Sequence, residues 1–276
     1  MKMSALRYLE LTFKTLHPQK EYKMKLTLIG AGPGDPDLIT MKGVKALQKA
    51  KVVLYDALIH PALLDHCPES CVKVHVGKRF GKHSCSQDVI NFMIVEYAYQ
   101  YGEVVRLKGG DSYVFGRGYE EFEFAARHGI ESEVIPGISS SYAVPALAGI
   151  PLTSRGVSES FWVVTGTTQS HQMSGDLALA AQSSATVVVL MGVHKLPEIV
   201  EIYSELGKLN QPIAIIQNGT LPNQKMVTGK ISNILPLVHI SGISSPAIIV
   251  IGKAAALPDA AIECVRQVTR KSDLMS

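Results

Sequence analysis

The stretch VVRLKGGDSYVFGRG, residues 104–118, indicates the class of fold. Its first four residues are apolar except for Arg106, which is typical of a strand buried in a sheet. Gly109 and Gly110 follow, and there the backbone can take a positive φ or lie close to another group. In α/β proteins, ligands bind at the carboxyl ends of the sheet strands. The stretch therefore predicts an α/β sheet with a binding site where this strand ends.

Similar apolar runs recur along the chain and alternate with segments of helical period. This alternation predicts an α/β protein of two α/β domains, with mostly parallel or mixed sheets. The predicted strands are 26–29, 52–55, 72–76, 104–107, 161–165, 186–191, 213–217 and 247–251, and the clearest helices are 41–50, 87–101, 119–128 and 196–206. Gly and Pro cluster near 136–137 and 149–151, so a domain junction is expected there. The predicted division is a loosely ordered extension 1–24, with Met24 as an alternative start, an N-terminal domain 25–136, a C-terminal domain 137–256 and a tail 257–276.

Composition excludes several classes of protein. With 46% hydrophobic and 18% charged residues, the chain of 276 residues is globular rather than disordered. A formal charge of +3 is too small to indicate nucleic-acid binding. No apolar run reaches the roughly eighteen residues of a spanning helix, and the first two dozen residues lack a secretory pattern. A cytoplasmic enzyme with no membrane partner is expected. The four cysteines show no repeated metal-ligand spacing, so reduced thiols and no metal are expected.

The glycine loop LTLIGAGPGDPDLIT, residues 26–40, allows two interpretations. A glycine-rich turn after a strand, with Asp56 after the next strand, is similar to a dinucleotide fingerprint. However, Asp35 stands where that fingerprint has its third glycine, and Pro33 removes a backbone donor from the phosphate cradle. These residues favour a ligand without phosphate that needs backbone contacts, such as a nucleoside with an amino-acid tail. A tight turn with no ligand also fits.

Five segments together identify a family. They are IGAGPGDPDLIT, VVLYDALI, VGKRFGKHS, VVRLKGGDSYVFGRGYEE, and VIPGISS with AGIPLTSR. In order and spacing they closely resemble the uroporphyrinogen III C-methyltransferases, from about residue 25 to about residue 253. The resemblance implies transfer of two methyl groups from S-adenosylmethionine to uroporphyrinogen III. The products would be precorrin-2, on the route to siroheme and cobalamin, and S-adenosylhomocysteine. It also implies a homodimer of two-domain subunits with the cofactor in the interdomain cleft.

Carried over residue by residue, the resemblance implies nine cofactor contacts. They fall on Pro33, Gly109, Gly110, Asp111, Val114, Ser139, Ser140, Met191 and Gly219. The glycine pair lets backbone groups reach the cofactor, and Asp111 can meet its charged methionine end. An Asp after glycine is also typical of a turn or a helix N-cap, so that role for Asp111 stays open.

Asp56 and Lys78 resemble the family's proton-handling pair. A pyrrole carbon attacks the sulfonium methyl, and the resulting cation is relieved by loss of a proton, which a carboxylate base and a lysine can handle. A structural acid at a strand end and a solvated lysine are the alternatives. The substrate is rich in carboxylates, and seven cations lie in or beside the recognised segments: Lys78, Arg79, Lys82, Arg106, Lys108, Arg117 and Arg155. Of these, Arg79, Arg117 and Arg155 are expected to bind substrate, with structural ion pairs as the alternative.

The chain departs from the family's usual pattern at several positions. Ser112 and Tyr113 replace Pro and Phe after GGD, while Ser154 and Thr167 replace histidines in the usual PLTHR and TGH. If the first of those histidines seats substrate or moves protons, the reaction here is slower or differs in regiochemistry. Three alternatives remain open. They are another tetrapyrrole (precorrin) methyltransferase of the same fold, an NAD-dependent oxidoreductase, and a cofactor-binding regulator without turnover.

Overall fold

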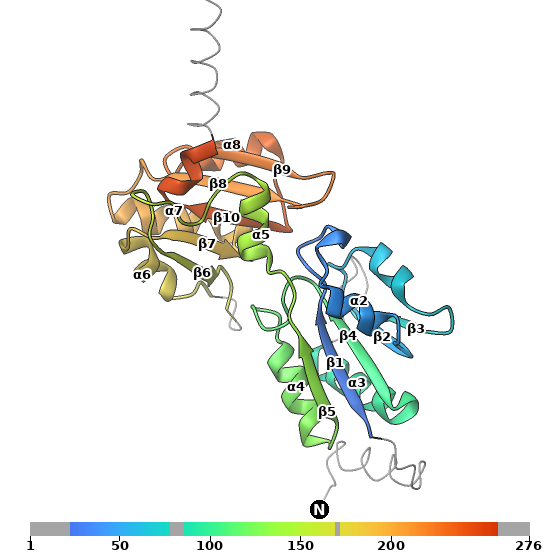
Figure 1. Ribbon diagram of the computed structural model, residues 1–276. Helices are drawn as coiled ribbons and strands as arrows, with labels where there is room; N and C mark the ends of the chain where they lie inside the picture. The colour runs from blue at the N-terminus through green and yellow to red at the C-terminus, as the bar shows by residue number, and fades with distance from the viewer. Residues whose placement is uncertain (1–22, 78–85, 169–171, 259–276) are drawn as a thin grey trace, which may run out of the picture.

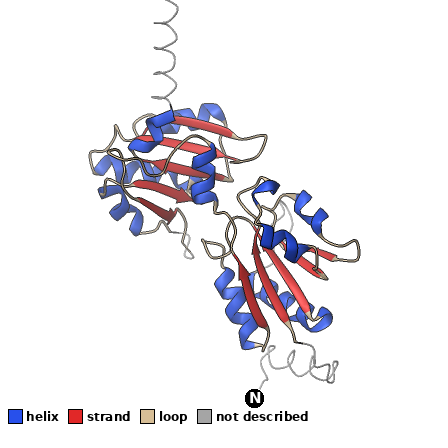
Figure 2. Ribbon diagram, viewed as in Figure 1, coloured by secondary structure: helices blue, strands red, loops and turns tan. Residues whose placement is uncertain are grey.

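The computed structural model describes residues 23–77, 86–168 and 172–258. These residues form two lobes, each built on a five-stranded sheet with helices on both faces (Figures 1 and 2). The N-terminal sheet is entirely parallel and has the order β3-β2-β4-β1-β5. Its strands are β1 (Lys25–Gly30), β2 (Val52–Tyr55), β3 (Val72–His75), β4 (Glu103–Lys108) and β5 (Glu131–Ile135).

Helices cover both faces of this sheet because its strands are apolar on both sides. Helices α3 (Gln87–Tyr101) and α4 (Gly118–Arg127) pack on one face, over side chains such as Leu28 and Leu54. The other face is covered by α2 (Met41–Leu47) and the 3-10 helix η2 (Pro61–His66), over Ile29, Val53 and Leu107. Each fully buried leucine or isoleucine contributes about 1.5–3 kcal/mol to folding. The two apolar layers hold the carboxyl ends of β1, β2 and β4 at one edge.

The C-terminal sheet is mixed and has the order β6-β7-β10-β8-β9. Its strands are β6 (Phe161–Thr165), β7 (Thr186–Leu190), β8 (Pro212–Gln217), β9 (Lys225–Lys230) and β10 (Ala247–Ile251). Among the described strands, β6 and β7 pair in parallel, and the other pairings are antiparallel. Helices α6 (Asp176–Gln182), α7 (Leu196–Glu205) and α8 (Ile234–Ser241) cover one face, while α5 (Ser140–Leu147) and η4 (Lys253–Ala256) cover the other. The expectation of two α/β domains with mostly parallel or mixed sheets is therefore confirmed: the first sheet is parallel and the second is mixed.

The connection between the sheets runs through residues 136–139. Strand β5 ends at Ile135, and α5, which begins at Ser140, packs on β7 and β10 of the second sheet. The predicted division at 136/137 lies in this connection. Within the described residues, no helix combines the length and the apolar character needed to cross a membrane.

Glu133 on the edge strand β5 should make stability depend on pH. Its carboxylate is 33% exposed and binds Lys25 Nζ at 2.7 Å and Lys42 Nζ at 2.5 Å. Hydrogen bonds from Lys25 and Lys42 lower the pKa of Glu133 to about 2. Because the folded pKa is depressed, the stabilisation is present above the unfolded pKa of about 4.3 and is lost as pH falls towards 2. Glu133→Gln is expected to cost less than about 1 kcal/mol at pH 7, since solvent screens the pairs.

Urea unfolding at pH 7 and pH 2 checks this prediction. The difference between wild type and Glu133→Gln should be clearly smaller at pH 2 than at pH 7, because about half of the Glu133 carboxylates are protonated there even in the folded protein. Glu69→Gln, which removes another exposed carboxylate of the same lobe, is the matched control. An equal loss of stability at both pH values for Glu133→Gln would contradict the ion-pair explanation.

Candidate active site

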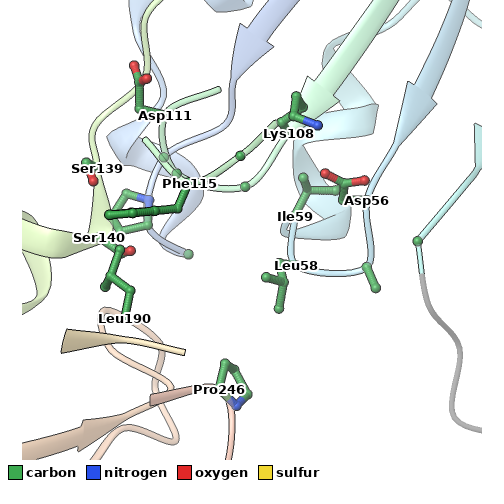
Figure 3. A pocket seen from close by; sticks show the side chains of 18 of the residues that line it. Asp56, Leu58, Ile59, Lys108, Asp111, Phe115, Ser139, Ser140, Leu190 and Pro246 are labelled. Carbon is green, nitrogen blue, oxygen red and sulfur yellow. The ribbon is translucent and has the colours of Figure 1, made fainter. Parts of the chain in front are cut away.

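A cavity of about 950 Å³ lies between the two lobes and has walls from both. In the N-terminal lobe it is lined by the segments that follow β1, β2 and β4. In the C-terminal lobe it is lined by the ends of β7 and β8 and by the start of α5. Figure 3 shows Asp56 and Lys108 on one side, with Leu190 and Pro246 across the cavity. Strand β4 thus ends at a cavity, as its two following glycines led us to expect.

Most predicted site residues meet at this cavity. All nine predicted cofactor positions line it, namely Pro33, Gly109, Gly110, Asp111, Val114, Ser139, Ser140, Met191 and Gly219. Asp56 and Arg117 line it as well. Arg155 does not belong to this lining and is exposed on the turn between Ser154 and Ser158. Lys78 and Arg79, like Lys82, lie outside the described residues. The binding and catalytic roles of all these residues stay predictions.

Four glycines let backbone segments cross at the floor of the cavity. Gly32 and Gly110 exchange backbone hydrogen bonds of 3.2 and 2.7 Å. A Cβ on Gly30 would lie 2.5 Å from the backbone of Gly137, and one on Gly137 would overlap the carbonyl oxygen of Gly110. Only residues without a side chain allow this approach. A ligand on this floor meets peptide N–H and C=O groups.

Asp111 ties two of these segments together. Its Oδ1 accepts a hydrogen bond from Tyr113 N at 2.8 Å, and its Oδ2 accepts one from Gly137 N at 3.0 Å. The turn role that the sequence left open is therefore present. Each carboxylate oxygen has a further lone pair, so a contact with the cofactor's charged end stays a prediction alongside it.

The glycine loop does not form a phosphate cradle. Asp35 Oδ1 accepts from Asp37 N at 2.9 Å and caps the 3-10 helix η1 (Pro36–Leu38). Asp35 N donates to Thr220 Oγ1 at 2.9 Å in the other lobe. Strand β1 also lies between β4 and β5 rather than beside β2, unlike the order of dinucleotide-binding sheets. Asp35 therefore joins the lobes, and the interpretation of a phosphate-free ligand is favoured.

Asp56 lies at the end of β2, where the chain leaves the sheet. Its side chain is 24% exposed, and its Oδ1 accepts a hydrogen bond from Arg106 Nη2 at 2.5 Å. Arg106 and Lys108 both bind Oε1 of Glu121, at 3.2 and 2.9 Å. The sequence grouped these two cations with possible substrate contacts, but both are buried and paired inside the wall. Burial and the neighbouring Arg106 lower the pKa of Lys108, while Glu121 opposes that shift.

Several non-glycine residues around the cavity have left-handed backbones. Phe115, Arg117, Met191 and Asn218, which line it, have φ between 50° and 58°, and the adjacent Thr220 has 73°. This conformation is uncommon outside glycine and costs about 1–3 kcal/mol per residue. Its concentration at one place marks a constrained, functional wall. Neither the composition nor the periodicity of the sequence predicts a left-handed backbone at these positions.

The unusual residues of this chain also have defined surroundings. Thr167 Oγ1 donates to Met191 O at 3.2 Å and pairs with His194 Nε2 at 2.9 Å. His194 thus lies beside Thr167, which stands where relatives usually have the histidine of TGH. Ser112 is fully buried, and its Oγ has no hydrogen-bond partner among the described residues. The hydroxyl at this position consequently adds no contact to the loop after GGD.

Comparisons with known proteins agree with this geometry. A Methanocaldococcus jannaschii uroporphyrinogen-III C-methyltransferase is 44% identical over 237 residues, which cover 85% of this chain and 98% of that protein. A siroheme synthase of Actinobacillus pleuropneumoniae is 44% identical over 84% of this chain, and the match spans 48% of the synthase. The uroporphyrin-III C-methyltransferase of Thermus thermophilus, solved with S-adenosylhomocysteine, is 35% identical with a TM-score of 0.71 and covers 84% of this chain and 99% of that chain.

The family assignment rests on most of the chain. The sequence profile of the tetrapyrrole (corrin/porphyrin) methylases matches residues 25–235, which include the whole N-terminal sheet and strands β6 to β9 of the second sheet. Every glycine-rich and strand-end segment of the cavity up to Leu221 lies within that match. The chain therefore belongs to the tetrapyrrole (corrin/porphyrin) methylases.

Proposed function

We propose that the protein transfers methyl groups from S-adenosylmethionine to carbon atoms of uroporphyrinogen III, two per acceptor. The product is precorrin-2, used for siroheme and cobalamin. The observation that carries this proposal is the interlobe cavity lined by all nine predicted cofactor positions together with Asp56. The 44% identity with a uroporphyrinogen-III C-methyltransferase over nearly its whole length supports the choice of acceptor.

The residues of the cavity fit S-adenosylmethionine. This cofactor has no phosphate, and the loop after β1 presents no phosphate cradle. Its nucleoside and amino-acid ends need hydrogen-bonding groups, which the glycine floor, the hydroxyls of Ser139 and Ser140 and the carboxylate of Asp111 offer. A volume of about 950 Å³ is at the upper end for ligand pockets. This leaves room for an acceptor beside the cofactor.

The chain's own residues would position the acceptor and take up a proton. S-adenosylmethionine, when bound, supplies an activated methyl group on sulfur. A pyrrole carbon forms the new C–CH₃ bond with its π electrons as the S–CH₃ bond breaks, and the acceptor then loses a proton. Asp56 Oδ1 is held by Arg106, whereas no described residue engages Oδ2. We assign the proton to Oδ2, with Lys78 as the second proton-handling group. Holding methyl and carbon in line supplies most of the rate.

Arg117 is proposed to bind an acceptor carboxylate, together with Arg79 and Arg155. It lines the cavity, and its guanidinium contacts Glu120 at 2.8 and 2.6 Å. Arg117→Ala is expected to raise KM for the acceptor about tenfold, since losing one charge-assisted hydrogen bond costs about 1.5 kcal/mol. Affinity for S-adenosylhomocysteine should not change. Steady-state kinetics and calorimetry measure the two quantities.

Arg127→Ala provides the matched control for Arg117→Ala. Arg127 is on the same helix and pairs with Glu123 on the exposed surface. If both variants keep the wild-type KM, Arg117 serves the structure only. If Arg117→Ala loses folding stability together with cofactor affinity, its pair with Glu120 is structural.

The proposed reaction is tested by anaerobic incubation of the protein with S-adenosylmethionine and freshly reduced uroporphyrinogen III. Product mass should rise by two methyl groups. Cofactor binding without transfer would identify a methylase with another acceptor, such as a later precorrin. Failure to bind S-adenosylhomocysteine, with binding of NAD in its place, would support the oxidoreductase alternative.

We also propose that the enzyme is a cytoplasmic homodimer. This rests on the resemblance to the family, which implies two-domain subunits in pairs. Sedimentation velocity should give twice the chain mass of 29.9 kDa. A species of single-chain mass at micromolar concentration would contradict the dimer.

A further inference from the structure

A cluster of buried charges lies in the wall of the cavity behind Asp56. Arg106, Lys108 and Glu121 have side chains that are 1%, 5% and 0% exposed. Together with Asp56 they contribute two cations and two anions, so the formal charges cancel. Asp56, Arg106 and Lys108 line the cavity, whereas Glu121 does not. Figure 3 shows Asp56 and Lys108 on the same side of the cavity. Burying such groups costs several kcal/mol per ion unless each is paired. The cluster therefore depends on its internal contacts.

Arg106 is held on three sides before it reaches Asp56. Its Nε donates to Glu121 Oε1 at 3.2 Å, and its Nη1 donates to the carbonyls of Leu54 and Leu107 at 3.4 and 3.2 Å. Its Nη2 donates to Asp56 Oδ1 at 2.5 Å. A guanidinium is planar and rigid. Anchoring Nε and Nη1 thus determines where Nη2 lies, and with it the carboxylate of Asp56.

Glu121 supplies the charged anchor of this arrangement. Its Oε1 accepts from Arg106 Nε, from Lys108 Nζ at 2.9 Å and from Gln87 Nε2 at 3.1 Å. Its Oε2 accepts no hydrogen bond from the described residues. Both other anchors of Arg106 are neutral peptide carbonyls. Charge-assisted hydrogen bonds are about twice as strong as neutral ones, so Glu121 fixes Arg106 more firmly than either carbonyl does.

We infer that Glu121 is a positioning residue for the proposed base: it fixes the guanidinium of Arg106, and Arg106 fixes the Asp56 carboxylate at the cavity wall. The inference rests on the proposed function, because it concerns the residue to which the proton is assigned. Glu121 is fully buried and does not line the cavity, so it would act through Arg106 rather than on a ligand. Since Oδ1 is held, the direction of the unengaged Oδ2 is set as well.

Glu121→Gln tests the inference with little change of shape. Three donors would then face a neutral amide, and Arg106 would be held less firmly. We expect kcat to fall about tenfold, while KM for the acceptor and the Kd of S-adenosylhomocysteine stay within about twofold, because Glu121 does not line the cavity. Arg106→Lys keeps the positive charge but cannot make all the hydrogen bonds of the fork. It should lower kcat by at least about tenfold.

A spectroscopic measurement separates positioning from folding. In ¹⁵N-labelled protein, the Nε–H proton of buried Arg106 should exchange slowly with water, and its signal is assigned by its absence in Arg106→Lys. Glu121→Gln should speed that exchange about tenfold. Backbone amides of β4 should keep their protection. If Glu121→Gln speeds the exchange of both the Arg106 Nε–H proton and the β4 backbone amides, Glu121 serves stability only, and the inference is overturned.

Glu123→Gln is the matched control on the same helix. Its carboxylate pairs with Arg127 on the exposed face, so kcat and the exchange of Arg106 Nε–H should stay within about twofold of wild type. An inactive wild type overturns the proposed function. An active wild type, an inactive Asp56→Asn and a fully active Glu121→Gln overturn only the present inference. If Glu121→Gln does not fold, Arg106→Lys decides, and a wild-type kcat there overturns it.

Discussion

Asp56→Asn is expected to lower kcat by about 10²–10⁴, the usual contribution of a general base, while the protein still binds S-adenosylhomocysteine. The amide of asparagine has nearly the same shape as the carboxylate, but it does not take up a proton near neutral pH. Arg106 keeps its contacts with Glu121 and with the carbonyls of Leu54 and Leu107. The fold should therefore persist. Single-turnover methyl transfer gives the rate, and calorimetry gives the cofactor affinity.

Asp65→Asn is the control for this variant. Asp65 is an exposed carboxylate on η2 in the same lobe, outside the lining of the cavity. The kcat of the Asp65→Asn variant should equal that of wild type. If Asp56→Asn retains kcat within a factor of about ten, the proton leaves by another route and Asp56 has a structural role. Lys78→Ala tests the second proposed proton-handling residue in the same assay.

The strand pattern was predictable where valine, isoleucine and leucine recur along a short run. All eight predicted strands and all four predicted helices are present within a few residues. Strands β5, ESEVI, and β9, KMVTGK, were not predicted. In each, only two adjacent residues are apolar, which is too short a run for the pattern on which the prediction depended. All four sheet edges are formed by β3, β5, β6 and β9, and of these β3 and β6 were predicted because valines recur in VKVH and FWVVT.

The candidate site was predictable where it depends on strand ends and glycines. Parallel strands bring their carboxyl ends to one edge, so distant motifs such as those of Gly109 and Ser139 line one cavity. The partners of Arg106 were not predictable. Charged residues are usually exposed, and Glu121 becomes a partner only when α4 packs on the face of the sheet, over β1 and β5. An acid on the inward face of a helix, next to Phe122 and Ala125, was the available signal.

Gly137→Ala is expected to have the second large effect, on both stability and cofactor binding. A Cβ on Gly137 would lie 2.6 Å from Gly30 Cα and would overlap the carbonyl oxygen of Gly110. These are backbone atoms of two crossing segments, which flexible side chains cannot relieve. Overpacking of this kind costs about 3 kcal/mol. Displacement of the loop at Gly110 should also weaken S-adenosylhomocysteine binding by about tenfold or more, since it forms the floor of the cavity.

Gly175→Ala separates crowding from a general effect of replacing glycine. Gly175 has φ of −59°, and a Cβ there would meet no atom within 4 Å. That variant should be unchanged or gain up to about 1 kcal/mol, because alanine restricts the unfolded chain. Urea unfolding and calorimetry measure both quantities for each variant. If Gly137→Ala has the same free energy of unfolding as Gly175→Ala and binds S-adenosylhomocysteine with wild-type affinity, close packing at the glycine crossing does not shape the floor of the cavity.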